Sequence, residues 1–389
     1  MSTTQLPGIK NSANSNIIPL DAHAVPVSDA TRIVTLPESF TLRGGDTLTN
    51  VQIAYETWGT LSAEKDNVVL IFTGLSPDAH AASSDQNPSS GWWEYMIGPG
   101  KPIDTHHFFV ICVNSLGSCF GSTGPASRNP KTGEPYRLDF PDLAIEDIAN
   151  TTRLALRELG IQHINTLVGP SLGGMSALAY AMEHAGEVDN LVLISAATHS
   201  TPFAIAIRSL QRELIRNDPA WKNGNYSMSH PPRDGMRMAR KAGLISYRSP
   251  DEWLQRFGRH KIDKSKRSKE PFAPEFEIES YLEYNARKFV DHFDANCYLY
   301  LSRAMDWFDV AEHGGSIEAG LSKITCKRVL VIGVASDFLF PVSQQQEVAD
   351  TLNQLGINTR LEILSSIQGH DAFLIDKDQF DPVMRSFFL

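Results

Sequence analysis

Long apolar runs are missing from this sequence of 389 residues, and none approaches the ~20 residues that a membrane helix needs. The four cysteines are too few and too scattered for a disulfide framework, and no pair of them has the spacing of a metal site. The formal net charge of −10 leaves no overall basic surface to neutralise the phosphates of a nucleic acid. The first 30 residues lack the basic leader and the apolar core of a secretory signal. We therefore expect a cytoplasmic protein without membrane, nucleic-acid or metal partners.

The remaining composition is that of an ordinary globular protein, with 42% hydrophobic and 21% charged residues. A chain of this length accommodates two average domains, but α/β enzymes often reach it as one domain with an insertion. Residues 1–30 are rich in Ser, Asn, Thr and Ala and show little periodicity. They are predicted to form a flexible N-terminal tail.

The order of the apolar segments predicts an α/β fold. Residues 143–159 place apolar side chains on one helical face, a second helix is expected from residue 174, and 43–46 carries a hairpin signal. Continuous apolar runs predict buried strands at 68–72, 108–113, 164–168, 191–195, 328–333 and 361–364. Strands that alternate with helices imply a mostly parallel sheet with helices on both faces.

This alternation stops between about residues 202 and 312, where helical segments, aromatic residues and loops replace the apolar strand runs. We interpret residues 203–315 as a helical cap inserted into an α/β core that comprises residues 31–202 and 316–389. The glycine- and serine-rich loop at 114–141 is long enough to favour a functional role, and simple covering of the sheet is its structural alternative.

A Gly-x-Ser-x-Gly pattern lies at 169–173, between the expected strand 164–168 and the helix that follows it. In this context the pattern indicates a nucleophile elbow, in which Ser171 sits on a strained turn and the flanking glycines leave room for neighbouring backbone. The helix N-terminus behind the serine offers N–H dipoles to developing negative charge. Glycines gathered at a strand-to-helix turn for structural reasons alone are the alternative.

A serine nucleophile needs a base to take its proton and an acid to orient that base, and in this architecture the three follow in the order Ser, acid, His. Asp337 follows the expected strand 328–333. Of the twelve histidines, His370 alone follows the final expected strand. These placements predict that Ser171 attacks, His370 transfers the proton and Asp337 holds the imidazole.

An oxyanion hole in such a site consists of two backbone N–H groups. We expect Leu172, directly after the nucleophile, to supply one and Leu75, just past the strand 68–72, to supply the other. A site of this kind makes an acyl-enzyme. The residues leave open whether water or another nucleophile completes the reaction.

Several segments outside the predicted triad carry a family signature: 54–60, 91–93, 98–101, 117–119, 121–125, 279–282 and 294–301. They resemble the homoserine/serine O-acyltransferase family, a group with the α/β-hydrolase fold, and the resemblance extends from about Phe40 to Leu389. It implies a ping-pong reaction without a cofactor, in which an acyl-CoA acylates Ser171 and the hydroxyl of an amino acid then takes the acyl group. It also implies a homodimer formed through the helical insertion.

By the same resemblance, Arg240 and Tyr247 bind the amino acid, with Arg240 on its α-carboxylate, whose geometry suits the guanidinium fork. Asp371, beside His370, would pair with the α-ammonium group. Without the family resemblance, Arg240 is interpreted as part of a surface ion pair on a helix.

Departures from the family pattern indicate the branch. Acetyl-transferring homoserine enzymes have Leu-Thr-Gly-Asp where this chain has Leu75, Ser76, Pro77 and Asp78. They also have methionine where Leu172 stands. The Leu-Ser-Pro-Asp segment resembles the serine O-succinyltransferase branch and is predicted to select the acceptor. Proline adds volume and fixes φ where glycine left the loop open, so a smaller pocket would favour serine over homoserine.

Arg208, early in the insertion, is the candidate for selecting the acyl-CoA, because a succinyl group carries a carboxylate and an acetyl group has none. Its structural alternative is a charge on the cap surface. We therefore expect transfer of succinyl from succinyl-CoA to the hydroxyl of L-serine, which feeds cysteine synthesis. The alternatives are succinyl or acetyl transfer to homoserine in methionine synthesis, an esterase, and a binding protein on an inactive hydrolase scaffold.

Overall fold

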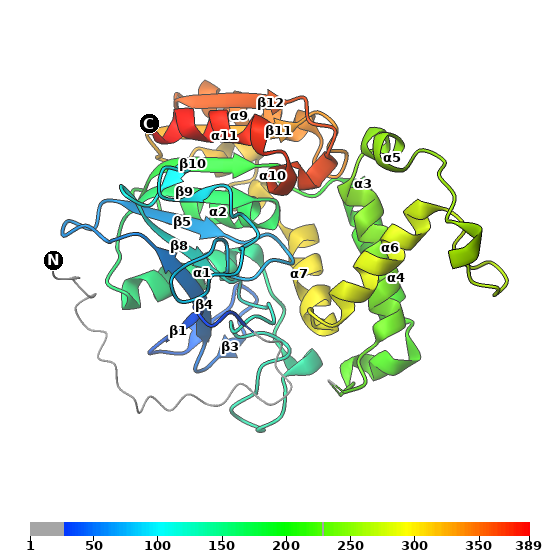
Figure 1. The fold of residues 1–389 in the computed structure, drawn as a ribbon. Helices are drawn as coiled ribbons and strands as arrows, with labels where there is room; N and C mark the ends of the chain where they lie inside the picture. The colour runs from blue at the N-terminus through cyan, green and yellow to red at the C-terminus, as the bar shows by residue number, and fades with distance from the viewer. Residues whose placement is uncertain (1–26, 228) are drawn as a thin grey trace.

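An eight-stranded sheet forms one part of the molecule, and a layer of helices stands beside it (Figure 1). The structure is a computed structural model and describes residues 27–227 and 229–389. The strands lie in the order β1-β4-β8-β5-β9-β10-β11-β12. They are β1 (Arg32–Thr35), β4 (Gln52–Trp58), β5 (Val68–Phe72), β8 (Phe109–Val113), β9 (Ile164–Pro170), β10 (Val188–Ile194), β11 (Arg328–Val334) and β12 (Thr359–Leu364). From β8 to β12 all neighbours are parallel, whereas β1 and β4 pair antiparallel at one edge. The predicted, mostly parallel sheet is confirmed.

The strands are apolar on both faces because both faces are covered. In β5, Val68, Leu70 and Phe72 join the hydrophobic cluster on one face, while Val69 and Ile71 join the cluster on the other. Side chains along a strand alternate with a period of two, so consecutive apolar residues are stable only where two layers bury them. For this reason the run 68–72 predicts its strand correctly.

Helices supply those two layers. Buried side chains of α1 (Ile145–Glu158), α2 (Leu172–Glu183) and α9 (Val342–Gln354) belong to one hydrophobic cluster. Those of α10 (Ala372–Ile375) and α11 (Lys377–Phe388) belong to the other, together with the short paired strands β6 (Ile97–Gly98) and β7 (Ile103–Asp104). The prediction of helices on both faces is therefore also confirmed.

Between β10 and β11 the chain leaves the sheet and forms a helical layer. It contains α3 (Pro202–Arg216), η2 (Pro219–Gly224), α4 (Arg233–Tyr247), α5 (Pro250–Phe257), η3 (Lys264–Lys266), α6 (Glu277–Val290), α7 (Ala295–Trp307), η4 (Val310–His313) and α8 (Ile317–Leu321). Figure 1 shows α3 to α6 beside the sheet and α7 between them and the sheet. Buried residues of α7 such as Tyr298 and Leu301 pack in the same cluster as α1 and α2, so α7 ties this layer to the core. The boundary at 203–315 stays a prediction.

The predicted hairpin is present as β2 (Phe40–Thr41) and β3 (Thr47–Leu48), which pair antiparallel. The loop 114–141 contains one short 3-10 helix, η1 (Arg137–Asp139), and its Ser122 hydroxyl accepts a hydrogen bond from the Ala54 N–H. Of the predicted tail at 1–30, residues 1–26 lie outside the described residues, and Ala30 is buried. No helix within the described ranges is long and apolar enough to cross a membrane.

Candidate active site

Ser171 occupies a strained turn between β9 and α2. Its φ of 55° and ψ of −123° are values that a residue with a Cβ rarely adopts. The flanking glycines are required by space: a Cβ on Gly169 would lie 2.1 Å from the Gly173 carbonyl oxygen, and a Cβ on Gly173 would lie 2.5 Å from that of Phe72. The close approach of these backbones therefore holds the serine in the geometry predicted for a nucleophile elbow.

The three residues of the predicted triad meet at the carboxyl ends of β9, β11 and β12. The Nε2 atom of His370 lies 2.8 Å from Oγ of Ser171, and its Nδ1 lies 2.7 Å from Oδ2 of Asp337. All three side chains are buried. The other carboxylate oxygen of Asp337 accepts two backbone N–H groups at 2.9 Å, from Leu339 and Phe340, which fixes the acid in place.

The surroundings of His370 set its proton affinity. Burial alone lowers the pKa of the imidazole, but the charge and hydrogen bond of Asp337 outweigh burial and hold the pKa above its usual 6.5. The Phe340 ring stacks on the imidazole with 4.9 Å between ring centroids. A serine hydroxyl on one nitrogen and an acid on the other form an arrangement that can remove the serine proton and stabilise the resulting imidazolium.

A cavity opens onto Ser171 and His370, and its walls come from both layers of the molecule. The loop after β5 contributes Gly74, Leu75, Ser76 and Pro77, and the catalytic edge contributes Asp371, Leu339, Phe373 and Leu374. Helices α3, α4 and α7 contribute Ile207, Arg208, Gln211, Ser246, Tyr247, Tyr298 and Met305. The helical layer thus supplies the wall that faces the nucleophile.

The two predicted oxyanion donors flank the nucleophile. Leu75 lines the cavity beside Ser171, and Leu172 is the first residue of α2, with its side chain buried. Their backbone N–H groups belong to the strand-end loop and the helix start that such a hole requires.

Arg208 is not on the cap surface, which overturns that alternative. Its side chain is 5% exposed, and Nε lies 2.6 Å from Oδ1 of Asp306. Nη2 donates to the Ser200 hydroxyl, whereas Nη1 is buried without a hydrogen-bond partner among the described residues. A buried donor beside the nucleophile that lacks a partner has unsatisfied hydrogen-bonding capacity. Sequence reasoning identified Arg208 but missed Asp306, the partner that holds it.

Arg240 projects from α4 toward aromatic rings. Its guanidinium carbon lies 4.3 Å from the ring centroid of Phe289 and 5.7 Å from that of Tyr247. Within the described ranges it forms no ion pair, and its Nε is buried without a hydrogen-bond partner. The surface ion pair that the residue types alone suggested is therefore wrong. Tyr247 itself lines the cavity.

Asp371 also lines the cavity, but it already has a cationic partner. Its Oδ2 lies 3.2 Å from Nε of Arg248, a residue that sequence reasoning missed. Burial raises the pKa of Asp371, and the charges of Arg248, His370 and Arg240 offset part of that rise. Arg248 directly follows α4 and has no sequence pattern of its own, because its role depends on the contact between α4 and the loop of His370.

Asp78 is the one predicted specificity residue that does not line the cavity. Its carboxylate accepts a hydrogen bond from the His80 backbone N–H at 2.9 Å, and its carbonyl oxygen accepts one from the Trp92 indole at 3.0 Å. The neighbouring Ser76 and Pro77 do line it. Gln211, Ser246 and Tyr298 are polar lining residues that were not predicted. All three are buried on helices, where a polar role leaves no sequence signal.

No group of three or more His, Cys, Asp or Glu side chains in the part of the chain that the structure describes is arranged to hold a metal ion.

The chain is similar to known proteins over most of its length. The α/β hydrolase fold family model matches residues 67–376. A serine O-succinyltransferase of Litchfieldella anticariensis is 59% identical over 360 residues, which cover 92% of this chain and 98% of the relative. Another serine O-succinyltransferase, from Stenotrophomonas maltophilia, is 56% identical and covers 93% of this chain and 98% of its own.

Solved structures agree in fold. A homoserine O-acetyltransferase from Bacillus anthracis superposes with a TM-score of 0.84 at 29% identity, covering 92% of this chain and 96% of the other. Esterase E22 superposes with a TM-score of 0.83 at 30% identity, covering 92% and 99%. The family model, the serine O-succinyltransferase relatives and these structures together place the chain in the homoserine/serine O-acyltransferase family of the α/β-hydrolase fold.

Proposed function

We propose that this protein transfers the succinyl group of succinyl-CoA to the hydroxyl of L-serine. The observation that carries the proposal is Arg208, a buried arginine beside Ser171 whose Nη1 has no hydrogen-bond partner among residues 27–227 and 229–389. A carboxylate at the far end of the acyl group would satisfy that nitrogen with a charge-assisted hydrogen bond. The relatives named serine O-succinyltransferase, at 56% and 59% identity, support the same transferred group and the same acceptor.

The first half-reaction would acylate the enzyme. Ser171 Oγ attacks the thioester carbonyl carbon while Nε2 of His370 takes the hydroxyl proton. The N–H groups of Leu75 and Leu172 stabilise the oxyanion of the tetrahedral intermediate. The C–S bond then breaks, CoA leaves as the thiol with the proton from His370, and Ser171 carries a succinyl ester.

The second half-reaction would return the enzyme to its resting state. The hydroxyl of L-serine loses its proton to Nε2 of His370 and attacks the ester carbonyl. When the intermediate collapses, Ser171 recovers its proton and O-succinyl-L-serine leaves. Arg240 would hold the acceptor's α-carboxylate, and the free oxygen of Asp371 would hold its α-ammonium group.

The choice of acceptor would rest on the segment Leu75, Ser76, Pro77 and Asp78. Pro77 lines the cavity, and its Cδ lies 3.7 Å from where a Cβ on Gly74 would be. Asp78 would act indirectly, because its carboxylate anchors the end of the segment instead of contacting the cavity. Serine is one methylene shorter than homoserine, and one methylene is worth only about 1–3 kcal/mol, so weak homoserine activity is expected.

Crossing two donors with two acceptors tests the proposal. Purified protein would be assayed with succinyl-CoA or acetyl-CoA against L-serine or L-homoserine, following release of free CoA thiol. We expect succinyl-CoA with L-serine to be the preferred pair. Acylation of homoserine alone would contradict the acceptor, and thiol release without any amino acid would indicate a hydrolase.

Arg208→Gln in the same assay tests the donor. Loss of the guanidinium should raise the KM for succinyl-CoA about 30-fold or more, as expected for one partner of a buried charge pair, and change the KM for acetyl-CoA far less. Arg212→Gln is the matched control, because Arg212 also pairs with Asp306, at 2.7 Å, but does not line the cavity. Equal effects of Arg208→Gln on both donors would exclude a role in succinyl recognition.

We further propose that the enzyme acts in the cytoplasm, as a homodimer, and feeds cysteine synthesis. The helical layer has large apolar side chains that are 49%, 47% and 54% exposed, at Phe203, Leu210 and Ile245. Association through this layer would cover them.

A further inference from the structure

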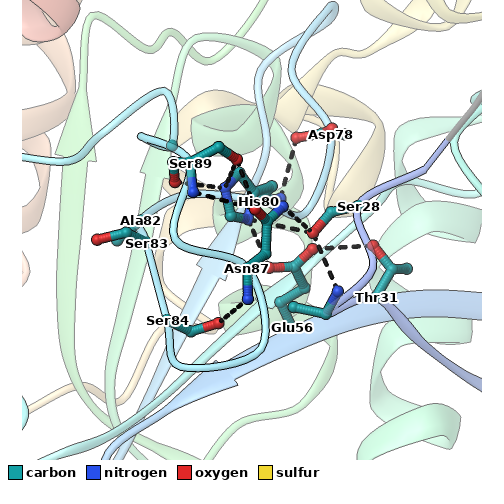
Figure 2. Close-up of polar contacts among 12 residues, drawn as sticks. Ser28, Thr31, Glu56, Asp78, His80, Ala82, Ser83, Ser84, Asn87 and Ser89 are labelled. Atoms are coloured by element: carbon teal, nitrogen blue, oxygen red, sulfur yellow. Dashed lines mark hydrogen bonds and ion pairs between the residues drawn. The ribbon is translucent and has the colours of Figure 1, made fainter.

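A second buried histidine lies outside the triad, in the segment that follows the loop after β5. Nδ1 of His80 lies 2.8 Å from Oε2 of Glu56 on β4, and Nε2 lies 3.0 Å from the carbonyl oxygen of Ser89 (Figure 2). The side chains of His80 and Glu56 are 9% and 1% exposed. The other oxygen of Glu56 accepts a hydrogen bond from the Thr31 hydroxyl at 2.8 Å. Every polar atom of the pair is therefore satisfied.

The partners of His80 hold it as an imidazolium. A carboxylate and a backbone carbonyl accept hydrogen bonds and cannot donate them, so both ring nitrogens must carry a proton. Two hydroxyls also lie near the ring. That of Ser89 is 3.2 Å from Nε2 and donates to Oδ1 of Asn87 at 2.7 Å, and that of Ser28 is 3.4 Å from Nδ1 and accepts the Asn87 amide N–H at 2.8 Å. Burial lowers the pKa of His80, but its hydrogen bonds to Glu56 and Ser89 outweigh burial and raise the pKa above 6.5. Below pH 6.5, the ordinary pKa of histidine, the ion pair contributes its full stabilisation to the fold. This stabilisation is lost as pH rises through the raised pKa of His80.

Two further titratable groups face this pair. Asp78 accepts the His80 backbone N–H, and burial raises the pKa of its carboxyl. Cys112 on β8 is the strand partner of Glu56, and burial raises the pKa of its thiol well above the usual value. His80 is thus the cation among these groups. Loss of its proton would leave Glu56 as a buried charge without a counter-charge.

The cluster anchors one end of the loop that borders the nucleophile. β5 anchors the chain up to Phe72, and a second anchor lies at Asp78 and His80, whose carbonyl oxygens accept the Trp92 indole at 3.0 Å and the Trp92 backbone N–H at 3.2 Å. Within the loop between them, the Pro77 carbonyl oxygen also accepts a hydrogen bond from the Asn114 side-chain amide at 3.4 Å. The residues between these two anchors include Leu75, Ser76 and Pro77, which line the cavity with Ser171. A change in the position of His80 therefore reaches the loop that carries the Leu75 N–H.

We propose that the ion pair of Glu56 and His80 positions the oxyanion-hole loop, so that the N–H of Leu75 stays aimed at the oxygen that develops charge on the acyl carbonyl. The role is one of positioning, because Nε2 of His80 contacts a backbone carbonyl and no hydroxyl that attacks substrate. This positioning role rests on the proposed oxyanion role of Leu75. It does not depend on which acyl-CoA or which amino acid the enzyme uses.

The test uses p-nitrophenyl acetate, whose acylation of Ser171 needs the triad and the oxyanion hole but not CoA or serine. Glu56→Gln can present its amide oxygen to His80 and its NH₂ to the Thr31 oxygen, so it removes the charge and keeps the shape. A displacement of about 1 Å in a catalytic group costs about 10²-fold in rate, and a loss of about that size in the acylation rate is expected. If the ion pair positions the loop, loss of the His80 proton should lower the acylation rate at alkaline pH. In Glu56→Gln, His80 should lose its proton at lower pH, so this alkaline fall in the rate should also move to lower pH.

Glu146→Gln is the matched control. Glu146 on α1 lies 2.7 Å from His313, and their side chains are 2% and 8% exposed, so this pair is as buried as the first but does not contact the cavity loop. Both variants should have a lower Tm, and only Glu56→Gln should slow acylation. His80→Gln, a second variant in the same cluster, should slow acylation equally and abolish the alkaline fall.

Two outcomes separate the positioning role from the proposed function. If Glu56→Gln and His80→Gln acylate at the rate of Glu146→Gln with an unmoved alkaline fall, the pair only stabilises the fold and the inference is overturned. If the unmodified protein reacts with p-nitrophenyl acetate but transfers no succinyl group to serine, the proposed function fails while the positioning role is still measured by the variants.

Discussion

His370 and His80 each place Nδ1 against a carboxylate and differ in what Nε2 faces. Each is buried, and each has Nδ1 against a carboxylate, at 2.7 Å from Asp337 and 2.8 Å from Glu56. Nε2 of His370 faces the Ser171 hydroxyl at 2.8 Å, whereas Nε2 of His80 faces the Ser89 carbonyl at 3.0 Å. A hydroxyl can give up a proton to the ring and a carbonyl cannot.

The partner of the second nitrogen therefore decides what a histidine–carboxylate pair does. Opposite a hydroxyl on a strained turn, the pair can cycle a proton and act as a base. Opposite a backbone carbonyl, the imidazole keeps a proton on both nitrogens, and the pair acts as a structural ion pair. In both pairs burial lowers the pKa of the histidine, and the neighbouring carboxylates, joined in His80 by the Ser89 carbonyl, more than offset burial. A raised pKa alone therefore does not identify the catalytic histidine.

Replacing each acid by its amide should separate the two pairs most strongly. Asp337→Asn should lower kcat about 10⁴-fold, because the amide no longer favours the required tautomer or stabilises the imidazolium. Glu56→Gln should cost about 10²-fold, because it displaces a loop and leaves the triad whole. Steady-state kinetics with the proposed substrates would measure both losses.

Ser171→Ala measures the activity that remains without the nucleophile, against which Asp337→Asn and Glu56→Gln are compared. It should lower kcat about 10⁶-fold. If Asp337→Asn lost no more activity than Glu56→Gln, the assignment of Asp337 to the triad would be wrong.

The pH dependence of acylation should assign one titration to each histidine. His370 must be neutral to take the serine proton, so the rate should fall about tenfold per pH unit below its pKa. Because that pKa is raised, the midpoint of the acid fall should lie above 6.5. Asp337→Asn should move this midpoint to lower pH, since it removes the charge that raised it.

Glu56→Gln should leave the acid midpoint unchanged and move only the alkaline one. Pre-steady-state release of p-nitrophenol, measured as a function of pH, would report both midpoints without the titration of an amino-acid acceptor. If Glu56→Gln shifted the acid midpoint, the assignment of that midpoint to His370 and of the alkaline midpoint to His80 would be contradicted.

The smallest expected effect concerns the loop that lines the cavity with His370 and continues along the chain to His80. Pro77→Gly should raise the ratio of homoserine to serine turnover about tenfold, because the pocket gains room for one methylene. The acylation rate with p-nitrophenyl acetate should change less than in Glu56→Gln, since Pro77 contributes no N–H group and the hydrogen bonds that hold Asp78 and His80 are kept. Competition between the two amino acids in one reaction, with product separation, would measure the ratio. An unchanged ratio would remove Pro77 from acceptor selection.

The pattern of apolar runs predicted the sheet and its helices, because burial on both faces requires uninterrupted apolar strands. The expected strand 164–168 is observed as β9, Ile164–Pro170, and the helix expected at 143–159 is α1, Ile145–Glu158. The order of Ser171, Asp337 and His370 along the chain also predicted their meeting, since parallel strands bring their carboxyl ends to one edge. Local periodicity and chain order carry this information directly.

The polar walls of the cavity depend on contacts between distant segments. Arg208 is held by Asp306 and Asp371 by Arg248, pairs that are 98 and 123 residues apart in sequence. Neither pair has a spacing that a sequence pattern detects. Asp78, predicted beside the acceptor, instead anchors the loop from behind, because its carboxylate is bound to the backbone of His80.

The α/β fold, the nucleophile elbow and the order of the triad could thus be predicted from the amino-acid sequence, because each is set by local pattern and strand topology. The packing of distant segments, by contrast, sets which arginine lines the cavity beside the nucleophile and which histidine can transfer a proton. Those two properties depend on what lies opposite a given atom within about 3 Å, the reach of a hydrogen bond, and the packing of separate layers sets that contact.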